Sequence, residues 1–487
     1  MAELETLAFD PVDAKAALAQ LPTSPAVFAL YGAEAHFEPY IGRTPNLRGR
    51  LERLLQPSAR HPRRLQLAGR VRQIRWRLTG SEFESLLLQF ELLHNEYGPK
   101  ALERMHLGAP AFVRFLGGNP YPRITVTNRP SQREAGWAYG PFPSRAAAER
   151  FADEALKLFL LRRCTEELAP HPSHPGCVYS EMKMCLAPCY QGCTDERYAE
   201  EAASVEHFLA TRGESRLVQL RTQRDTASTN LEFEAAAAAH AQVVRVESVR
   251  ALASELVRPL AQLRAVVLQA SAVPGEVAVF LYENGRLSGP AGFSTLGMRI
   301  QNEQSGSTSL FAHPVAIEAI PEAPITDAPI PEVVTAEQAA KKLEIDPALY
   351  QGTTSVVPQI LQKESGALAT EESSSEEAPD FPSSPENAPA EAESPAPAKL
   401  ARGVLEARME AALAALAAPS QALSPTLRQG HLALLKRWYY RPEARRSGEI
   451  FFPDAEGRWP IKALLRGVGR IAGKMLVEVR GLPPFPQ

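Results

Sequence analysis

The chain has 487 residues, of which 45% are hydrophobic, so it is long and apolar enough to form several buried cores. This length and composition exclude a disulfide miniprotein, a collagen and a wholly disordered chain. No stretch approaches the roughly 18 uninterrupted apolar residues of a membrane-spanning helix, and the first ten residues hold three acids, unlike a secretory signal. We therefore expect a soluble, cytoplasmic protein with no membrane partner.

The charges are distributed unevenly along the chain. The formal net charge is −3, but residues 364–398 hold nine acids and no base, which leaves +6 for the remainder. Residues 43–77 hold eleven arginines against a single acid, Glu52. Because the planar guanidinium makes forked contacts with phosphate, this segment indicates a DNA-binding surface that includes Arg48, Arg53, Arg63 and Arg64. The alternative is a solvated helical face.

Residues 15–105 are predicted to form a compact α/β domain. Two strands, 26–32 and 36–42, are separated by a turn, and a helix that Asn46 could cap follows with its leucines on one face. Residues 74–78 alternate like a third strand, and a further helix begins at Ser81.

Residues 106–197 are predicted to be a small sheet with a cysteine module. Strands at 112–115 and 123–127 precede an aromatic, proline-rich turn at 137–143 and a helix at 146–163. All five cysteines of the chain then fall between Cys164 and Cys193. Five cysteines are too few for a secreted disulfide framework, and their clustering predicts a metal site in a reducing compartment.

The rest of the chain divides into four parts. Residues 198–262 have the long pattern of a helical hairpin, and residues 263–313 return to strand patterning with Asn284-Gly285 as a hairpin turn. Residues 314–399 are predicted to be a disordered linker, because 13 of the 42 prolines and a Glu, Ser and Ala bias lie between positions 314 and 397. Residues 400–487 are predicted to be a helical C-terminal module. The fold class is therefore α/β and multidomain.

The motif around Tyr40 resembles a known nuclease family. Residues 40–51 read Y-I-G-R-x-x-N-L-R-x-R-L, which by itself describes a hairpin packed on a basic helix. Residues 26–28 (AVF) and 40–42 (YIG) are similar to the two tripeptides of the GIY-YIG nuclease domain of UvrC-type excinuclease subunits, which include the shorter Cho proteins. Residues 81–93 (SEFESLLLQFELL) resemble the family's SEVEALLLEANLI helix.

The resemblance continues to about residue 300. Residues 121–129 (YPRITVTNR) and 139–144 (YGPFPS) resemble the family's approach to its cysteines. Residues 226–243 (TASTNLEFEAAAAAHAQV) are similar to the family's hairpin that binds a UvrB partner, the UVR-like element. Residues 278–293 resemble the opening strands of its second, RNase H-like nuclease, so residues 263–313 are interpreted as a remnant of that domain.

The resemblance implies catalytic positions and an eroded metal site. In the family a glutamate binds one divalent ion, Mg²⁺ or Mn²⁺, a tyrosine acts on the water, and an arginine stabilises developing charge. Tyr40 and Arg50 match the tyrosine and the arginine, and Arg43 adds phosphate-binding charge. Gln89 stands at the metal position, where a neutral amide is a poorer ligand than a carboxylate. Phe28 stands where the first motif has tyrosine.

The predicted helix offers no replacement for the missing carboxylate. Glu84 and Glu91 point away from the face of Gln89, and Glu82 shares that face but lies roughly 10.5 Å away along the axis. The carboxylate motifs of an RNase H-like centre are also missing after Leu296, so the second nuclease is predicted to be absent or truncated.

Four cysteines suit thiolate ligation of a metal or cluster. Cys164, Cys177, Cys185 and Cys189 are separated by 12, 7 and 3 residues, without the CxxC pairs common in zinc sites. Spacing alone leaves zinc and iron–sulfur equal, and the resemblance to the family's iron–sulfur segment implies a [4Fe-4S] cluster. Cys193 would be a spare thiol or a competing ligand. The remaining alternative is a loop of unligated cysteines.

Two C-terminal stretches allow two interpretations each. Residues 436–446 (KRWYYRPEARR) mix bases with aromatics that would stack on nucleobases or, as we favour, form a small core. Residues 465–476 (LRGVGRIAGKML) resemble the turn of helix-hairpin-helix DNA binders, although an ordinary amphipathic helix is favoured.

The sequence therefore favours a UvrC-like DNA-binding protein of nucleotide excision repair, a GIY-YIG endonuclease that makes at most a single metal-dependent incision. Its partners would be double-stranded DNA and a UvrB-type helicase docked on residues 220–250. The alternative is a catalytically eroded DNA-binding scaffold that docks the same partner.

Overall fold

The computed structural model describes residues 4–34, 36–55, 67, 69–130, 136–296, 298, 397–418 and 423–479. The predicted linker lies outside these residues except for its last three, which begin a helix, so the predicted boundary at residue 400 is slightly late. Residues 299–313 of the predicted β-rich remnant also lie outside them. In the described part of the chain the strands form three four-stranded sheets.

The first sheet belongs to the N-terminal α/β domain and has the strand order β1-β4-β2-β3, antiparallel throughout. Its strands are β1 (Glu5–Ala8), β2 (Ala26–Gly32), β3 (Tyr40–Thr44) and β4 (Val71–Leu78), and its helices are α1 (Ala14–Ala19), α2 (Leu47–Leu55), α4 (Glu82–Tyr97) and α5 (Lys100–Arg104). Because β1 pairs with β4, the domain begins before the predicted residue 15. Four mostly exposed residues are too short a run to show this in the sequence.

Local capping explains where the helices of this domain begin. Asn46 accepts a hydrogen bond from the backbone N–H of Gly49 at 2.8 Å, which confirms the predicted cap of α2. The hydroxyl of Ser81 accepts from the backbone N–H of Glu84 at 3.1 Å, so α4 begins at the predicted position.

The second sheet lies in the middle of the chain and has the order β6-β5-β7-β8. Its elements are β5 (Ala111–Phe115), β6 (Ile124–Thr127), β7 (Ala138–Phe142), β8 (Arg258–Pro259), α6 (Arg145–Leu156) and α7 (Val178–Glu181). The predicted turn at 137–143 is wrong, because all five residues of β7 are buried and pair with β5 and β8. Pro141 is tolerated because the β5–β7 ladder shifts register there. Helix α6 also ends at Leu156, earlier than predicted.

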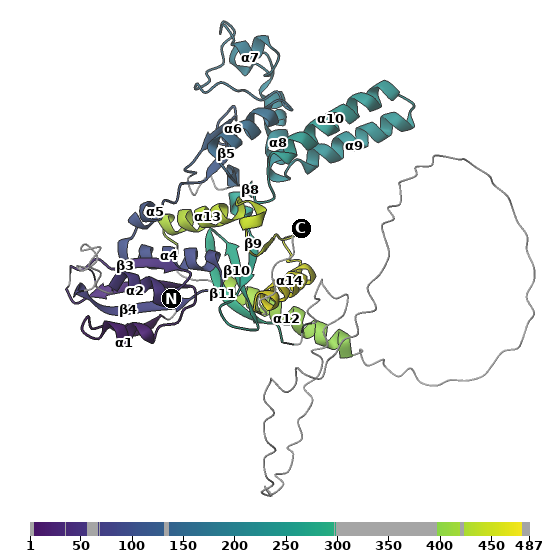
Figure 1. The fold of residues 1–487 in the computed structure, drawn as a ribbon. Coiled ribbons are helices and arrows are strands. Elements are labelled where there is room, and N and C mark those ends of the chain that lie inside the picture. Colours follow the sequence, from purple (N-terminus) through teal and green to yellow (C-terminus); the bar gives the residue numbers. More distant parts are fainter. Residues whose placement is uncertain are drawn as a thin grey trace, which may run out of the picture. The chain divides into compact units, whose positions relative to one another are not determined.

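Three helices follow the cysteine loop, namely α8 (Asp195–Ala210), α9 (Glu214–Thr229) and α10 (Phe233–Ala251). Helices α9 and α10 pack against each other as a hairpin (Figure 1). The predicted helical hairpin is therefore present within residues 198–262. The turn between α8 and α9 uses Gly213, whose φ of 82° favours glycine.

The third sheet joins two segments that are far apart in sequence. It has the order β11-β10-β9-β12, with β9 (Ala265–Ala270), β10 (Glu276–Glu283), β11 (Arg286–Ser294) and β12 (Glu449–Phe451). Asn284 and Gly285 have φ values of 53° and 79°, which confirms the predicted hairpin turn. Strand β12 pairs antiparallel with β9, so residues 263–294 and the C-terminal segment form one sheet rather than two modules. A three-residue strand carries no periodicity that would reveal this in the sequence.

The C-terminal helices are α12 (Pro397–Ala417), α13 (Pro425–Tyr439) and α14 (Ile461–Val479). Residues 465–476 lie within α14, as the favoured interpretation of an amphipathic helix predicts. Trp438 is 1% exposed and belongs to the core, which confirms the favoured interpretation of the KRWYYR segment for this residue.

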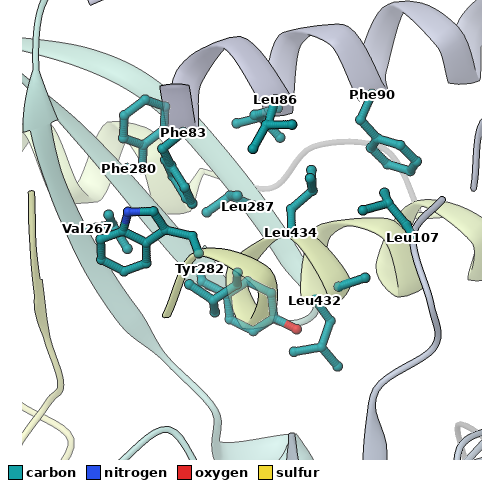
Figure 2. Close-up of a cluster of buried hydrophobic side chains, with 14 of the residues drawn as sticks. Phe83, Leu86, Phe90, Leu107, Val267, Phe280, Tyr282, Leu287, Leu432 and Leu434 are labelled. Atoms are coloured by element: carbon teal, nitrogen blue, oxygen red, sulfur yellow. The ribbon is translucent and has the colours of Figure 1, made fainter. Parts of the chain in front are cut away.

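One hydrophobic core connects the N-terminal domain with the third sheet. Figure 2 shows side chains of α4, of the sheet and of α13 packed together. The members drawn there include Phe83, Leu86 and Phe90 of α4, Phe280, Tyr282 and Leu287 of the sheet, and Leu432 and Leu434 of α13. Helix α13, which lies beyond the predicted linker in sequence, therefore contributes to the same core as α4.

Candidate nucleic-acid interface

The motif at Tyr40 is built from two neighbouring strands. Gly42 of β3 lies opposite Phe28 of β2 in the ladder, and the rings of Phe28 and Tyr40 have centroids 6.0 Å apart. A Cβ atom on Gly42 would lie 3.1 Å from Cζ of Phe28 and 3.3 Å from Cε1 of Tyr40. Glycine therefore lets the two rings approach over the strand. Phe28 is 1% exposed and fills the core, whereas Tyr40 is 38% exposed.

Tyr40 and Gln89 line the same open cleft, whose volume is about 550 Å³. The loop before β3 contributes His36 and Glu38 to its wall, and helix α4 contributes Gln89. Arg50 does not line this cleft. Two of the five residues that the resemblance assigns to catalysis are therefore brought to one surface, at the predicted metal position and the predicted tyrosine position.

Glu38 is a residue of this cleft that reasoning from the sequence missed. It lies two positions before Tyr40, and an alternating segment places such residues on the same face, which is the signal that could have found it. Its carboxylate pairs with Arg104 at 2.9 Å. The cleft thus contains one carboxylate, already paired, and the neutral amide of Gln89.

Arg43 is held in an ion-pair network rather than left free for phosphate. Its Nη1 lies 3.0 Å from Oε1 of Glu82, and Arg441 binds the same carboxylate through two hydrogen bonds of 2.6 and 3.0 Å. The hydrogen bonds from Arg441, and then those from Arg43, lower the pKa of Glu82 to about 2. Glu82 is therefore committed to two arginines and is unsuited to replace the missing metal ligand.

The other two acids of α4 lie in different surroundings. Glu84 is 5% exposed and accepts a hydrogen bond from the backbone N–H of Gly80 at 2.9 Å, and burial raises its pKa. Burial raises the pKa of Glu91 to about 7. Neither residue lines the cleft of Tyr40 and Gln89.

The arginine-rich segment has structural and free members. Nε of Arg48 donates to the carbonyl of Leu21 at 2.7 Å, and Nε of Arg53 donates to the carbonyl of Gly49 at 3.0 Å. The guanidinium of Arg50 has no ion-pair partner among residues 4–34, 36–55 and the other described ranges. Arg63 and Arg64 lie outside the described residues.

The four predicted ligand cysteines come near one another in the loop between α6 and α8. Burial, and then the nearby thiols of Cys164, Cys177 and Cys189, raise the pKa of Cys185 to about 11. The backbone N–H of Ala187 donates to Sγ of Cys185 at 3.2 Å. The donor set therefore has the composition of a thiolate site.

The thiols do not adopt a ligating arrangement. In the part of the chain that the structure describes, no group of three or more His, Cys, Asp or Glu side chains is placed to hold a metal ion. Four thiols fit a zinc ion or an iron–sulfur cluster by their chemistry.

The turn between α9 and α10 exposes two large apolar side chains. Leu231 is 71% exposed and Phe233 is 68% exposed. They are more exposed than the other large apolar residues on the surface of the hairpin, Val218 and Val244, and exposed apolar residues of this kind mark a surface suited to a protein partner. No described helix is both long and apolar enough to cross a bilayer.

Comparison with known proteins identifies the middle of the chain. Residues 112–208 match the UvrC/Cho excinuclease middle domain, the segment that forms β5 to most of α8. No solved structure matches the chain.

Curated relatives extend the similarity beyond that segment. The UvrABC system protein C of Alcanivorax borkumensis is 29% identical over 242 residues, which is 50% of this chain and 39% of the relative. Those of Shigella dysenteriae serotype 1 and Escherichia coli are each 31% identical over 243 residues, 49% of this chain and 41% and 39% of the relatives. The chain thus spans about two fifths of the length of these relatives. These matches confirm the predicted resemblance: over about half of its own length the chain is similar to the UvrC-type excinuclease subunits.

Proposed function

We propose that the chain is a UvrC-like DNA-binding protein of nucleotide excision repair, whose N-terminal domain makes at most a single metal-dependent incision. The observation that carries this proposal is the shared cleft of Tyr40 and Gln89, in a domain whose helix α2 presents Arg50 without an ion-pair partner in the described residues. Exposed Tyr40 can donate a hydrogen bond to a phosphate oxygen, and Arg50 can neutralise its charge. Both contacts bind the DNA backbone without reading its sequence.

The residues at the predicted metal position are poor ligands for the ion that cleavage requires. A Mg²⁺ or Mn²⁺ ion prefers carboxylate oxygens, whereas the cleft offers the amide of Gln89 and the paired carboxylate of Glu38. The commitment of Glu82 to Arg43 and Arg441 supports the second candidate, a catalytically eroded scaffold that binds DNA and docks a partner.

A binding and nicking assay separates the two candidates. Purified full-length protein is incubated with damaged and undamaged supercoiled duplex, with and without Mn²⁺, and compared with Arg50→Ala. The endonuclease proposal expects metal-dependent nicks that Arg50→Ala abolishes, and the scaffold expects binding without nicks. Arg458→Ala is the matched control, because this exposed arginine is already neutralised by Asp454 and Glu456. If the wild type neither binds nor cuts DNA, both candidates fail.

We also propose that residues 220–250 dock a UvrB-type helicase. Leu231 and Phe233 at the hairpin turn support this assignment, since exposed apolar side chains at a tip bind well into a partner's groove. Phe233→Ser should weaken co-purification with such a helicase, whereas Val273→Ser, an exposed apolar residue elsewhere, should not. Equal binding by both variants would exclude the turn as the docking surface.

The cysteine loop is proposed to hold a [4Fe-4S] cluster through Cys164, Cys177, Cys185 and Cys189, with zinc as the alternative. A cluster would supply a rigid cross-link for a loop that has few buried side chains of its own. Protein purified anaerobically should be brown and contain about four irons per chain. Replacing Cys189 by serine should remove the iron, whereas Cys193→Ser should retain it. Stoichiometric zinc without iron would contradict the cluster.

A further inference from the structure

Three half-buried arginines meet around Tyr439, at the base of the α9–α10 hairpin. They are Arg212 in the turn between α8 and α9, Arg258 in β8, and Arg446 in the segment after α13. Arg212 and Arg258 bind the adjacent carbonyls of Ser254 and Glu255, the hydroxyl of Ser254 lies 2.8 Å from that of Tyr440, and the guanidinium carbon of Arg446 lies 5.5 Å from the ring centroid of Tyr439. Three distant parts of the chain thus bring positive charge to one place.

The hydrogen bonds of these arginines leave their charges uncompensated. Arg212 donates to the carbonyl of Ser254 at 3.4 Å, Arg258 to the carbonyl of Glu255 at 3.0 Å, and Arg446 to the carbonyl of Tyr439 at 3.0 Å. Within the described ranges none of the three forms an ion pair. Nε of Arg212 is also buried without a partner in that part of the chain.

Several other partly buried arginines of this protein are paired with a carboxylate, unlike those of the cluster. Arg441 binds Glu82 at 2.6 Å, Arg264 binds Glu283 at 2.6 Å, and neighbouring Arg250 binds Glu214 at 3.0 Å. These pairs show one way in which the fold compensates a partly buried guanidinium, whereas Arg162 and Arg163 bind backbone carbonyls instead.

The electrostatics of the cluster favour an added anion. Burial lowers the pKa of Arg212 and of Arg258, and the charge of Arg212 lowers the pKa of Arg258 further. The exposed carboxylate of Glu255 acts in the opposite direction on both. Three guanidinium groups against one carboxylate leave an excess of positive charge that the protein itself does not balance.

The space behind the cluster is too small for that anion. Arg212 and Arg250 line a cavity of about 30 Å³ together with Phe208 and Val257. Such a volume admits one water molecule. A larger anion would therefore have to bind outside this cavity, on the solvent side of the half-buried arginines.

We propose that Arg212, Arg258 and Arg446 form a second phosphate-binding site for the DNA backbone, built from elements other than those of the Tyr40 cleft. This inference rests on the proposed DNA-binding function. The planar guanidinium suits forked contacts to a phosphate. Contacts of this kind position DNA without reading its sequence.

The test measures DNA affinity of the full-length protein against salt by fluorescence anisotropy. The variant is Arg212→Gln/Arg258→Gln, and the matched control is Arg216→Gln/Arg224→Gln on α9, whose arginines are exposed and bonded to Gln219 and Asp225. Loss of two phosphate contacts should lower affinity at least tenfold at low salt and reduce the salt slope by about 2. The control should keep the wild-type slope.

Stability distinguishes a binding site from a structural role. Because the two charges repel each other and are partly desolvated, their removal should leave the thermal midpoint unchanged or raise it. If the double variant keeps the wild-type salt slope, the proposal is overturned. This holds also when the variant binds DNA more weakly but has a lowered thermal midpoint, because the lost affinity then reflects lost stability.

Titration with inorganic pyrophosphate tests the arginine site independently of the proposed DNA-binding function. If the wild type fails to bind DNA, the proposed function fails, and the thermal midpoint is then followed during titration with inorganic pyrophosphate. A rise in wild type that the double variant lacks supports the anion site. No rise in wild type overturns it.

Discussion

His431 is a buried histidine of helix α13 that forms no ion pair with the described residues. Its Nδ1 accepts a hydrogen bond from the backbone N–H of Leu287 at 3.2 Å. Burial, and then the charges of Arg286 and His94, lower its pKa to about 4. The unfolded chain takes up this proton near pH 6.5. The stability contributed by neutral His431 is therefore complete above about pH 6.5 and is lost as the pH falls through about 4.

We expect His431→Gln to flatten the acid limb of the stability curve. An amide can still accept the hydrogen bond from Leu287 but does not titrate, so about 2–3 kcal/mol of pH dependence should disappear. Urea unfolding at pH 7 and pH 4.5 measures the difference.

Glu91 makes stability depend on pH with the opposite sign, so its carboxyl group must be removed before the effect of His431 is measured. Its raised pKa of about 7 means that stability falls as the pH rises from about 4.5 towards 7. The experiment is therefore made in a Glu91→Gln background. If that background shows the same acid dependence with and without His431, the histidine is not the cause.

Gln89 decides whether the cleft can hold a metal ion. Gln89→Glu adds a carboxylate of nearly the same length beside Tyr40, so we expect Mn²⁺-dependent nicking of DNA to rise. Glu38→Gln is the control for the other carboxylate of the cleft. Wild-type cutting that Gln89→Glu leaves unimproved would show that the metal position is assigned wrongly. Adding Phe28→Tyr supplies the missing hydroxyl but places it in a side chain that is 1% exposed.

Helix α13 depends on a glycine where it crosses α4. A Cβ atom on Gly430 would lie 1.9 Å from Cζ of Phe90, a ring in the shared core. Gly430→Ala should therefore destabilise the protein by about 1–3 kcal/mol, because overpacking outweighs the gain in helix propensity. Chemical denaturation measures the loss.

The same substitution at Gly469 is the matched control. Gly469 lies within helix α14, and a Cβ atom there would meet nothing within 4 Å. Gly469→Ala should raise stability by about 0.5–1 kcal/mol. Equal effects of the two substitutions would contradict the close packing of α13 on α4.

In the described molecule, residues before the predicted linker at 314–399 contact residues that follow it. Strand β12 completes the sheet of β9, and Arg441 binds Glu82 across 359 positions of sequence. We expect a chain cut at a protease site inserted after Tyr350 to remain one particle in gel filtration, because burial and pairing, rather than the covalent link, join the parts. Separation of the fragments in native buffer would contradict this.

The charge-reversal variant Arg441→Glu measures how much the ion pair with Glu82 contributes to the association of the cut fragments. It leaves the hydrophobic core in place but sets a carboxylate against Glu82, so the cut fragments should dissociate at lower denaturant than those of the wild type. Arg458→Glu is the control on the same fragment.

Local order was determined by the sequence itself. The strand at 26–32, the helix that begins after Ser81 and the turn at Asn284-Gly285 follow from nearest-neighbour chemistry, namely alternation, capping and positive φ. The motifs at Tyr40 and in the middle of the chain likewise identified the UvrC-type relationship. Each of these signals is contained in a few consecutive residues.

Tertiary structure decided which distant residues act together. The pairing of β12 with β9, the burial of Pro141 in a strand and the meeting of Arg212, Arg258 and Arg446 all depend on contacts between remote segments. Sequence periodicity reports the environment of one element and not its partner. The sequence therefore predicted Arg43 as a phosphate-binding residue, but only the fold showed that it already pairs with Glu82, whose carboxylate Arg441 also binds.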